Sequence, residues 1–325
     1  MRKKSVETFA EFQRRRNFEF YSSRGGRIYS SFRTFAHSKR FAEANAAEFV
    51  RRAPRKGKLR IYEVGVGDGS FALNFMKALH NLCEEIAERT TYFLWDFSEK
   101  GVDLAAEKLA GFAHEKVVSP AWDSKKMRNA NCVKCNELLD DLPTRMLVRR
   151  GRRLNEVARE GRGFLEVEAH AEEGTWSFME GMPDGYLIPV PEKGLECVLG
   201  WKKKLARDGW IDIFDYGFAD AEEMRGMPRD AWNAAVVRSF SGQVTVDVNF
   251  AFLKMSAGGR TEPQKDYVER ALGMDLWEVD VGGRLDYYSY GEVWKKRKKL
   301  EKEGYDIGIL LAGIEKSGYL HMETG

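Results

Sequence analysis

Residues 60–71 read RIYEVGVGDGSF and combine one carboxylate with three closely spaced glycines. Gly65, Gly67 and Gly69 follow an apolar run, and Glu63 stands two residues before the first of them. Glycines at this spacing let a ligand approach the backbone, and the start of a following helix favours polar or negative groups. The stretch therefore predicts a ligand-binding turn between a strand and a helix. The alternative is a tight connection that binds nothing.

The residue types around this turn narrow the choice of ligand. The dinucleotide fingerprint G-x-G-x-x-G would need glycine where the chain has Ser70. Glu63 would repel phosphates, whereas it suits a ligand that carries an ammonium and a sulfonium, namely S-adenosylmethionine. Asp96 ends the next expected strand, 31 residues after Gly65, and its two oxygens can accept both ribose hydroxyls. We therefore expect an S-adenosylmethionine site, with a nucleotide or dinucleotide site as the alternative.

The elements that must position these residues alternate along the chain. Apolar residues at helical spacing predict four helices, over residues 37–52, 70–89, 99–112 and 192–206. Short apolar runs predict strands over residues 58–64, 91–96, 115–119, 131–143, 210–215 and 305–313, the fourth of which runs into a turn. This alternation predicts a doubly wound α/β fold with a parallel sheet and helices on both faces.

The alternation of strands and helices is interrupted at residues 144–191, where segments with a period of two residues alternate with Gly/Pro turns. This pattern predicts a β-rich insertion after the fourth strand. Ligands bind at the carboxyl ends of parallel strands, so the insertion should lie beside the acceptor. We expect an N-terminal helical extension or lid over 1–54, a cofactor-binding half of the core over 55–143 and a second half of the core over 192–325.

Composition limits the classes of protein. With 43% hydrophobic and 32% charged residues, the chain of 325 residues is typical of a globular protein, and no apolar run approaches the roughly 18 residues of a membrane span. The opening residues lack the apolar segment of a signal peptide. Four cysteines indicate a reducing compartment, so we expect a cytoplasmic protein. Cys132 and Cys135 lie in an expected strand without a second pair, which favours packing over a metal site.

Basic residues are clustered although the net charge is only +3. The clusters fall at residues 14–16, 51–60, 149–153, 202–204 and 295–299. Such runs are usually solvated faces, and the alternative is a surface for RNA or a ribonucleoprotein.

Several blocks resemble the MidA-type class I methyltransferases, relatives of a mitochondrial complex I assembly factor. They include EVGVGDGS, YFLWDFSEKGVDLAAEKL, the segment 191–217 that ends in D-Y-G and, as the most specific motif, NELLDDLP at 136–143. The resemblance spans roughly residues 58–270. It implies a seven-stranded class I sheet, S-adenosylmethionine as cofactor with Trp122 and Asp123 near the adenine, and symmetric methylation of an arginine on a partner protein.

Some positions depart from the pattern of that family. Gln243, Asp247 and Asn249 stand where the family tends to have Asp, His and Asp, and residues 25–41 lack its G-D-F-x-T-x-P-E loop. These positions would shape the acceptor pocket and its lid. Two other functions therefore stay open, an RNA methyltransferase and a non-catalytic, cofactor-binding assembly factor. A homodimer is one assembly that we consider.

An arginine acceptor would need carboxylates in bidentate geometry. Glu137 and Asp140 stand three residues apart just after the fourth strand, and in a helix they would share a face. Asn136 would then face the methyl donor, and Tyr216 of the D-Y-G turn would close the far side. The alternative is that Asn136 and Asp140 only cap the turn.

Overall fold

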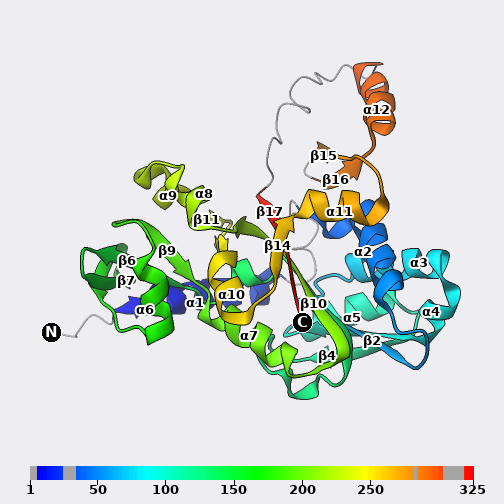
Figure 1. Ribbon diagram of the computed structural model, residues 1–325, viewed down its shortest axis with the longest axis horizontal. Coiled ribbons are helices and arrows are strands. Elements are labelled where there is room, and N and C mark those ends of the chain that lie inside the picture. Colours follow the sequence, from blue (N-terminus) through cyan, green and yellow to red (C-terminus); the bar gives the residue numbers. More distant parts are fainter. Residues whose placement is uncertain (1–5, 25–33, 282–283, 303–317) are drawn as a thin grey trace.

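A mixed sheet of eight strands forms the centre of the α/β core (Figure 1). The computed structural model describes residues 6–24, 34–281, 284–302 and 318–325. The strand order is β14-β17-β10-β5-β2-β3-β4, and β13 pairs with β10 beside this path. The strands are β2 (Leu59–Val64), β3 (Thr90–Asp96), β4 (His114–Val118), β5 (Ala130–Asn136), β10 (Leu205–Phe218), β13 (Val248–Asn249), β14 (Arg260–Pro263) and β17 (Tyr319–Thr324).

The core sheet is parallel except at β17, which runs antiparallel to β10 and to β14. Seven strands form the main path of the sheet. The described sheet has eight because the two-residue β13 continues alongside the end of β10. The strand expected over 305–313 lies outside the described residues.

Helices cover both faces of this sheet because each carries an apolar face. One core cluster joins the sheet to α2 (Lys39–Arg52), α3 (Ser70–Leu82), α5 (Glu99–Lys108) and α11 (Gln264–Leu272). The cluster on the other face includes α7 (Glu192–Lys202) and α10 (Phe250–Ala257). The helix expected over 70–89 is interrupted at Cys83, whose extended backbone ends α3 before α4 (Glu84–Arg89).

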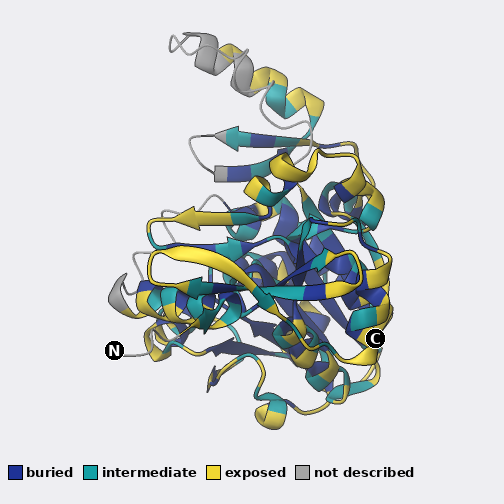
Figure 2. Cartoon of the chain, turned by 90° about the vertical axis from the view of Figure 1, so that its left-hand side faces the viewer, coloured by how far each residue is buried: buried dark blue, intermediate teal, exposed yellow. Residues whose placement is uncertain are grey.

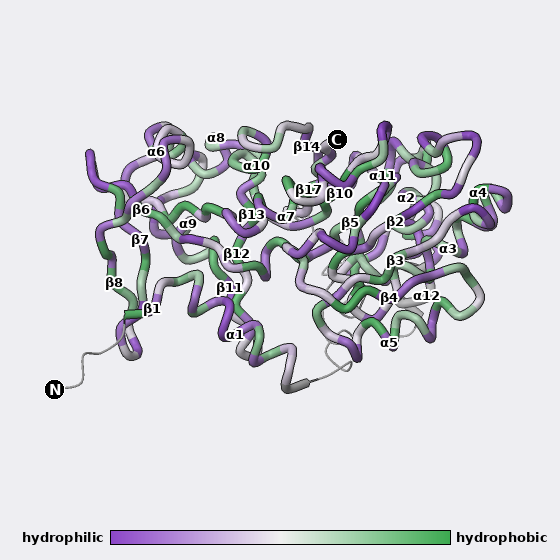
Figure 3. The backbone as a smooth tube through the Cα atoms, turned by 90° about the horizontal axis from the view of Figure 1, so that it is seen from below, coloured by the Kyte–Doolittle hydropathy of each residue, from purple (hydrophilic) through white to green (hydrophobic). Residues whose placement is uncertain are grey.

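A second, antiparallel sheet lies at the other end of the molecule, as Figure 3 shows from below. It comprises β1 (Glu7–Thr8), β6 (Arg145–Arg150), β7 (Arg153–Glu160), β8 (Gly163–Glu168) and β9 (Leu187–Val190). The segment 144–191 also contains a helix, α6 (Glu173–Glu180), which the period-two pattern did not predict. Phe178 and Met179 of α6 are buried against the sheet, so the segment is not all β.

The core of this second sheet draws on chain outside 144–191. It includes buried residues of α8 (Ala221–Arg225), α9 (Arg229–Ala235) and the hairpin of β11 (Val237–Phe240) and β12 (Gln243–Val246). Phe9, the first residue of α1 (Phe9–Arg24), joins the same core. The second body is therefore larger than the expected insertion.

A small hairpin and a helix lie at the outer edge of the core. β15 (Trp277–Val281) pairs with β16 (Arg284–Tyr288), and α12 (Tyr290–Lys302) extends away from the body (Figure 2). The residues of α12 whose burial is described are mostly exposed. Across the described ranges, no helix has the length and apolar character needed to cross a membrane.

Candidate functional site

The glycine-rich turn joins β2 to α3, as expected, and its glycines adopt a backbone that other residues avoid. Gly65, Gly67 and Gly69 have φ angles of 80°, 57° and 74°. The amides of Gly65 and Val66 both donate to the carbonyl of Trp95, at 2.8 and 3.1 Å, which ties the turn to the end of β3. The turn is therefore held open at the carboxyl edge of the sheet.

A pocket of about 1100 Å³ opens at this edge and extends to α1. Five of the residues expected from the sequence line it, namely Gly65, Gly67, Asp96, Trp122 and Glu137. The other six expected residues, Glu63, Gly69, Asp123, Asn136, Asp140 and Tyr216, do not line it. The structure thus brings the cofactor and acceptor residues together only in part.

Asp96 lies where the sequence predicted it, at the end of β3 and on the pocket wall. Its carboxylate accepts from the amide of Ser98 at 2.9 Å and from the amide of Gly67 at 3.4 Å. Burial raises the pKa of Asp96 to about 6, against the effect of these amides. A carboxylate held beside a bare glycine backbone fits the ribose hydroxyls of S-adenosylmethionine.

Glu63, which we expected at the cofactor site, does not line this pocket. Alternate side chains of β2 point to opposite faces, so Glu63 faces the same side as Ile61, toward α3. There its carboxylate accepts from the Tyr92 hydroxyl at 2.7 Å. Burial raises the pKa of Glu63 to about 8. Its hydrogen bond therefore joins β2 to β3 on the face of the sheet that α3 covers.

Gly69 also has a packing role. It precedes α3, and a Cβ on Gly69 would lie 2.5 Å from the Cα of Ala105 in α5. Only glycine therefore lets α3 and α5 approach this closely. The two remaining expected cofactor residues differ in position. Trp122 is 39% exposed and lines the pocket. Asp123 does not line it and instead caps the short helix that follows, where its side chain accepts from the Lys125 amide at 3.4 Å.

Glu137 and Asp140 do not share a helical face. Glu137 has a left-handed backbone with φ of 47°, and the short 3₁₀ helix that contains Asp140 begins only at Leu139. Glu137 lines the pocket and accepts from the Thr34 hydroxyl at 2.6 Å. Asp140 is 4% exposed and accepts from the Tyr216 hydroxyl. The expected pair is thus held by separate partners, and only Glu137 faces the pocket.

The 3₁₀ helix (Leu139–Asp141) is fixed by Asp215, which the sequence did not single out. Asp215 is fully buried at the end of β10 and accepts from the amides of Leu139, Asp140 and Tyr216 at 2.9, 3.3 and 3.0 Å. The acidic residue next to Tyr216 in the D-Y-G block was the available signal. The hydrogen bonds of Asp215 explain how β10 and the distant segment Leu139–Asp141 are joined at this turn.

Asp141 is a second residue that the sequence reasoning missed, and unlike Asp215 it lines the pocket. The amide nitrogen of Gln243 donates to both of its oxygens, at 2.8 and 2.9 Å, and the Tyr21 hydroxyl donates to one of them. The side chain of Asn17 adds a contact at 3.1 Å. Asp141 stands next to Asp140 in NELLDDLP, and nothing in that motif distinguishes which aspartate faces the pocket.

These four acids, Glu137, Asp140, Asp141 and Asp215, form what we call the carboxylate cluster. Burial raises the pKa of Glu137 to about 8 and that of Asp140 to about 6. Burial, with repulsion by Asp140, raises the pKa values of Asp141 and Asp215 well above their ordinary range. The cluster is therefore an environment in which a bound cation would be strongly stabilised.

Two polar atoms near this cluster have no hydrogen-bond partner among the described residues. They are Oδ1 of Asn136 and Oδ1 of Asp140. Buried polar groups normally have partners, but neither residue lines the pocket, so these two acceptors lie behind its wall. Arg238 contacts the Tyr216 ring, with its guanidinium carbon 4.6 Å from the ring centre, and forms an ion pair with Asp247 at 2.7 Å.

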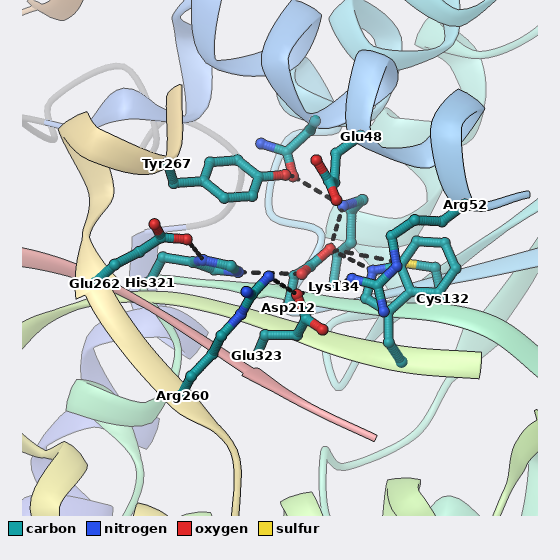
Figure 4. Close-up of polar contacts among 12 residues, drawn as sticks. Glu48, Arg52, Cys132, Lys134, Asp212, Arg260, Glu262, Tyr267, His321 and Glu323 are labelled. Atoms are coloured by element: carbon teal, nitrogen blue, oxygen red, sulfur yellow. Dashed lines mark hydrogen bonds and ion pairs between the residues drawn. The ribbon is translucent and has the colours of Figure 1, made fainter. Parts of the chain in front are cut away.

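A separate polar cluster lies between the core sheet and α2 (Figure 4). Lys134 of β5 donates to Asp212 of β10 at 2.9 Å and to Asn45 of α2 at 2.8 Å. His321 of β17 bridges Asp212 and Glu262 at 3.1 Å each. These contacts join neighbouring strands and fix their register. Across the described ranges, no group of side chains is arranged to hold a metal ion.

The family comparison agrees with this geometry. Residues 44–261 match the family described as "Putative S-adenosyl-L-methionine-dependent methyltransferase". The chain belongs to this family, since the match covers about two thirds of it. The protein is therefore an S-adenosylmethionine-dependent methyltransferase, with S-adenosylmethionine as its cofactor.

The fold also occurs in two crystal structures of related proteins from Burkholderia thailandensis. The chain superposes on an uncharacterized protein with a TM-score of 0.68 at 17% identity, and on a second protein, bound to S-adenosyl-homocysteine, with a TM-score of 0.63 at 18% identity. Each superposition covers 98% of this chain and 87% of the other. At this identity, the likeness concerns the fold. No curated protein matches the sequence.

Proposed function

We propose that the protein transfers the methyl group of S-adenosylmethionine to an arginine side chain of a partner protein. The observation that carries this proposal is the carboxylate cluster beside the cofactor wall, where Glu137 and Asp141 line the same pocket as Gly65 and Asp96. A guanidinium would supply the positive charge that these buried carboxylates favour. The resemblance of NELLDDLP to the MidA-type arginine methyltransferases supports the same acceptor.

The role of the protein residues follows from the chemistry. The sulfonium methyl group is already electrophilic, so the protein must mainly place a nucleophile in line and exclude water. Glu137, on the pocket wall, holds one edge of the guanidinium and localises its charge away from the attacking nitrogen. When that nitrogen attacks, the bond between carbon and sulfur breaks, S-adenosylhomocysteine leaves, and the nitrogen loses a proton. Glu137 is placed to take up this proton.

An RNA acceptor has less support. In the basic cluster at 149–153, Arg150 pairs with Glu166 at 2.5 Å, and Arg149 donates to the carbonyl of Met182. Lys202 likewise donates to the carbonyl of Ala257. Side chains engaged in this way offer fewer free charges to phosphates.

The test uses two variants that keep shape and remove charge, Glu137→Gln and Asp140→Asn. Each variant is incubated with host proteins and with S-adenosylmethionine labelled in its methyl group. We expect Glu137→Gln to abolish most transfer of the label to protein, while calorimetry shows unchanged affinity for S-adenosylmethionine. Asp140→Asn should have a smaller effect, because Asp140 acts through Tyr216. Normal transfer by both variants would contradict the proposal. Glu115→Gln, on an exposed residue of β4, is the matched control.

A further inference from the structure

The pocket is larger than one cofactor requires. Sites for drug-sized ligands measure about 300–1,000 Å³, and this pocket measures about 1100 Å³. The ends of β2, β3 and β5 line the part beside the glycine turn. Most of the remaining wall comes from α1 and the residues before it, from residues 119–122 and from residues within 138–143, with Arg159 and Gly161 near the end of β7. A second ligand therefore has room between α1 and the core.

Two adjacent stripes of α1 face different surroundings. Gln13 and Asn17 are buried, and each donates to a backbone carbonyl. Gln13 donates to that of Asp140 in the 3₁₀ helix at 2.9 Å, and Asn17 donates to that of Val244 in β12 at 2.8 Å. A neighbouring stripe of Glu11, Arg14, Phe18 and Tyr21, at the three- and four-residue spacing of one helix face, lines the pocket together with Arg15 and Asn17. The helix is thus fixed on one side and presents the other to the pocket.

The presented stripe places two aromatic residues, Phe18 and Tyr21, beside the charged Glu11 and Arg14. Phe18 is 64% exposed, and Phe97, on the opposite wall beside Asp96, is 46% exposed, although both line the pocket. The rings of Tyr21 and Phe97 lie 6.1 Å apart and nearly perpendicular, so the two walls meet at this point. Exposed aromatic side chains that face each other across a pocket mark a binding surface.

The charges of the rim point to the chemistry of the occupant. Arg14 is exposed and makes no ion pair with a described residue, whereas its neighbour Arg15 pairs with Glu7 at 2.9 Å. Farther inside, the carboxyl groups of Glu137 and Asp141 line the pocket, and a bound cation would favour their ionised forms. A ligand would complement this wall if its cationic group bound at the pocket floor and its acidic or apolar groups bound at the rim. A nucleic acid would instead bring phosphates toward the acidic floor.

We propose that the groove between α1 and Phe97 binds an extended polypeptide segment of the partner protein. Its acceptor arginine enters the carboxylate cluster, a flanking apolar residue packs on Phe18, and a flanking acidic residue pairs with Arg14. This inference rests on the proposed function, because it assumes an arginine acceptor. It adds the sequence around that arginine as the feature that the enzyme selects.

The experiment is a charge reversal read out with a peptide library. Peptides with one central arginine and varied flanking positions are incubated with labelled S-adenosylmethionine and the wild-type protein, Arg14→Glu or Phe18→Ala. The control is Arg152→Glu, an equal charge change in the exposed turn between β6 and β7. Calorimetry of S-adenosylmethionine binding and the unfolding temperature show that each variant is folded and loads the cofactor.

We expect the wild type and Arg152→Glu to favour an acidic residue at one flanking position. Arg14→Glu should reverse this preference toward lysine or arginine by about fivefold, as for an exposed ion pair, and Phe18→Ala should weaken the apolar preference. If arginine peptides are methylated but Arg14→Glu does not change the flanking preference, the inference is overturned and the proposed function stands. No transfer to any arginine peptide, with transfer to single-stranded RNA instead, would overturn both.

Discussion

Asp141 and Tyr21 are joined by a hydrogen bond at the pocket, although 120 residues separate them in the sequence. Tyr21 belongs to α1, and its ring also packs against Phe97, which directly follows Asp96. This one side chain therefore links the helix, the carboxylate cluster and the cofactor loop. The position of Asp141 in the pocket depends on α1.

Tyr21→Phe should remove this link while keeping the ring contact. Asp141 would keep Gln243 and Asn17 but lose one donor to a buried carboxylate. Hydrogen bonds to charged groups contribute about 1.5–3 kcal/mol, so we expect kcat/KM for methyl transfer to fall by about tenfold or more. The affinity for S-adenosylmethionine should stay unchanged by calorimetry. An unaltered kcat/KM would show that Tyr21 does not position Asp141.

Asp96→Asn should weaken cofactor binding. The variant keeps the shape of the side chain but replaces one acceptor oxygen by an amide, which removes a bond to a ribose hydroxyl at a cost of about 1.5–3 kcal/mol. Asp123→Asn is the matched control, because Asp123 does not line the pocket. Isothermal calorimetry compares the two. Equal affinity of wild type and Asp96→Asn would remove Asp96 from the ribose site.

Gly69→Ala should destabilise the fold more than Gly57→Ala does. Both glycines have positive φ, 74° and 92°, so both variants are strained. Only at Gly69 would the new Cβ also meet backbone, at 2.5 Å from the Cα of Ala105. We expect a loss of about 1–3 kcal/mol in the free energy of unfolding beyond that of Gly57→Ala. Urea unfolding measures the difference, and equal losses would contradict the packing role.

His321 should make the stability depend on pH. Burial alone would lower its pKa, but the hydrogen bonds to Asp212 and Glu262 raise it above the ordinary 6.5. The folded protein therefore holds this proton more tightly than the unfolded chain does. The stabilisation is complete below about pH 6.5 and is lost as the pH rises through the folded-state pKa.

The measurement is the free energy of unfolding in urea between about pH 6 and pH 9 for the wild type and His321→Gln. We expect stability to fall with rising pH in this window, with a smaller slope in the variant. Parallel slopes would mean that His321 carries no raised pKa. Glu262, whose pKa is lowered to about 2, acts in the opposite sense and only at acidic pH.

The core could be predicted from the sequence because its signals are local. The apolar run ending at Val64, the glycine turn and Asp96 indicated the strand, the turn and the acid at the next strand end, and the structure has all three in place. Glu63 faces the opposite side of the strand from its neighbour Val64, which lines the pocket, so its expected contact with the cofactor stays a prediction. The family match then showed the cofactor that these residues suggested.

The acceptor wall could not be predicted, because long-range contacts create it. The buried stripe of α1 contains Gln13 and Asn17, so its burial leaves no hydrophobic periodicity to detect. Asp215 acts on a turn 75 residues away through backbone amides, and sequence spacing carries no information about such a contact. The left-handed backbone of Glu137 likewise separated two acids that a helix would have aligned.

The most direct test of the central claim is the chemical identity of the methylated product. The protein is incubated with S-adenosylmethionine labelled in its methyl group and with host lysate, and the labelled macromolecules are digested to amino acids and nucleosides. The account predicts that the label appears in methylated arginine, that protease releases it and nuclease does not, and that Glu137→Gln abolishes it. Label in nucleosides, or in amino acids other than arginine, would contradict the account.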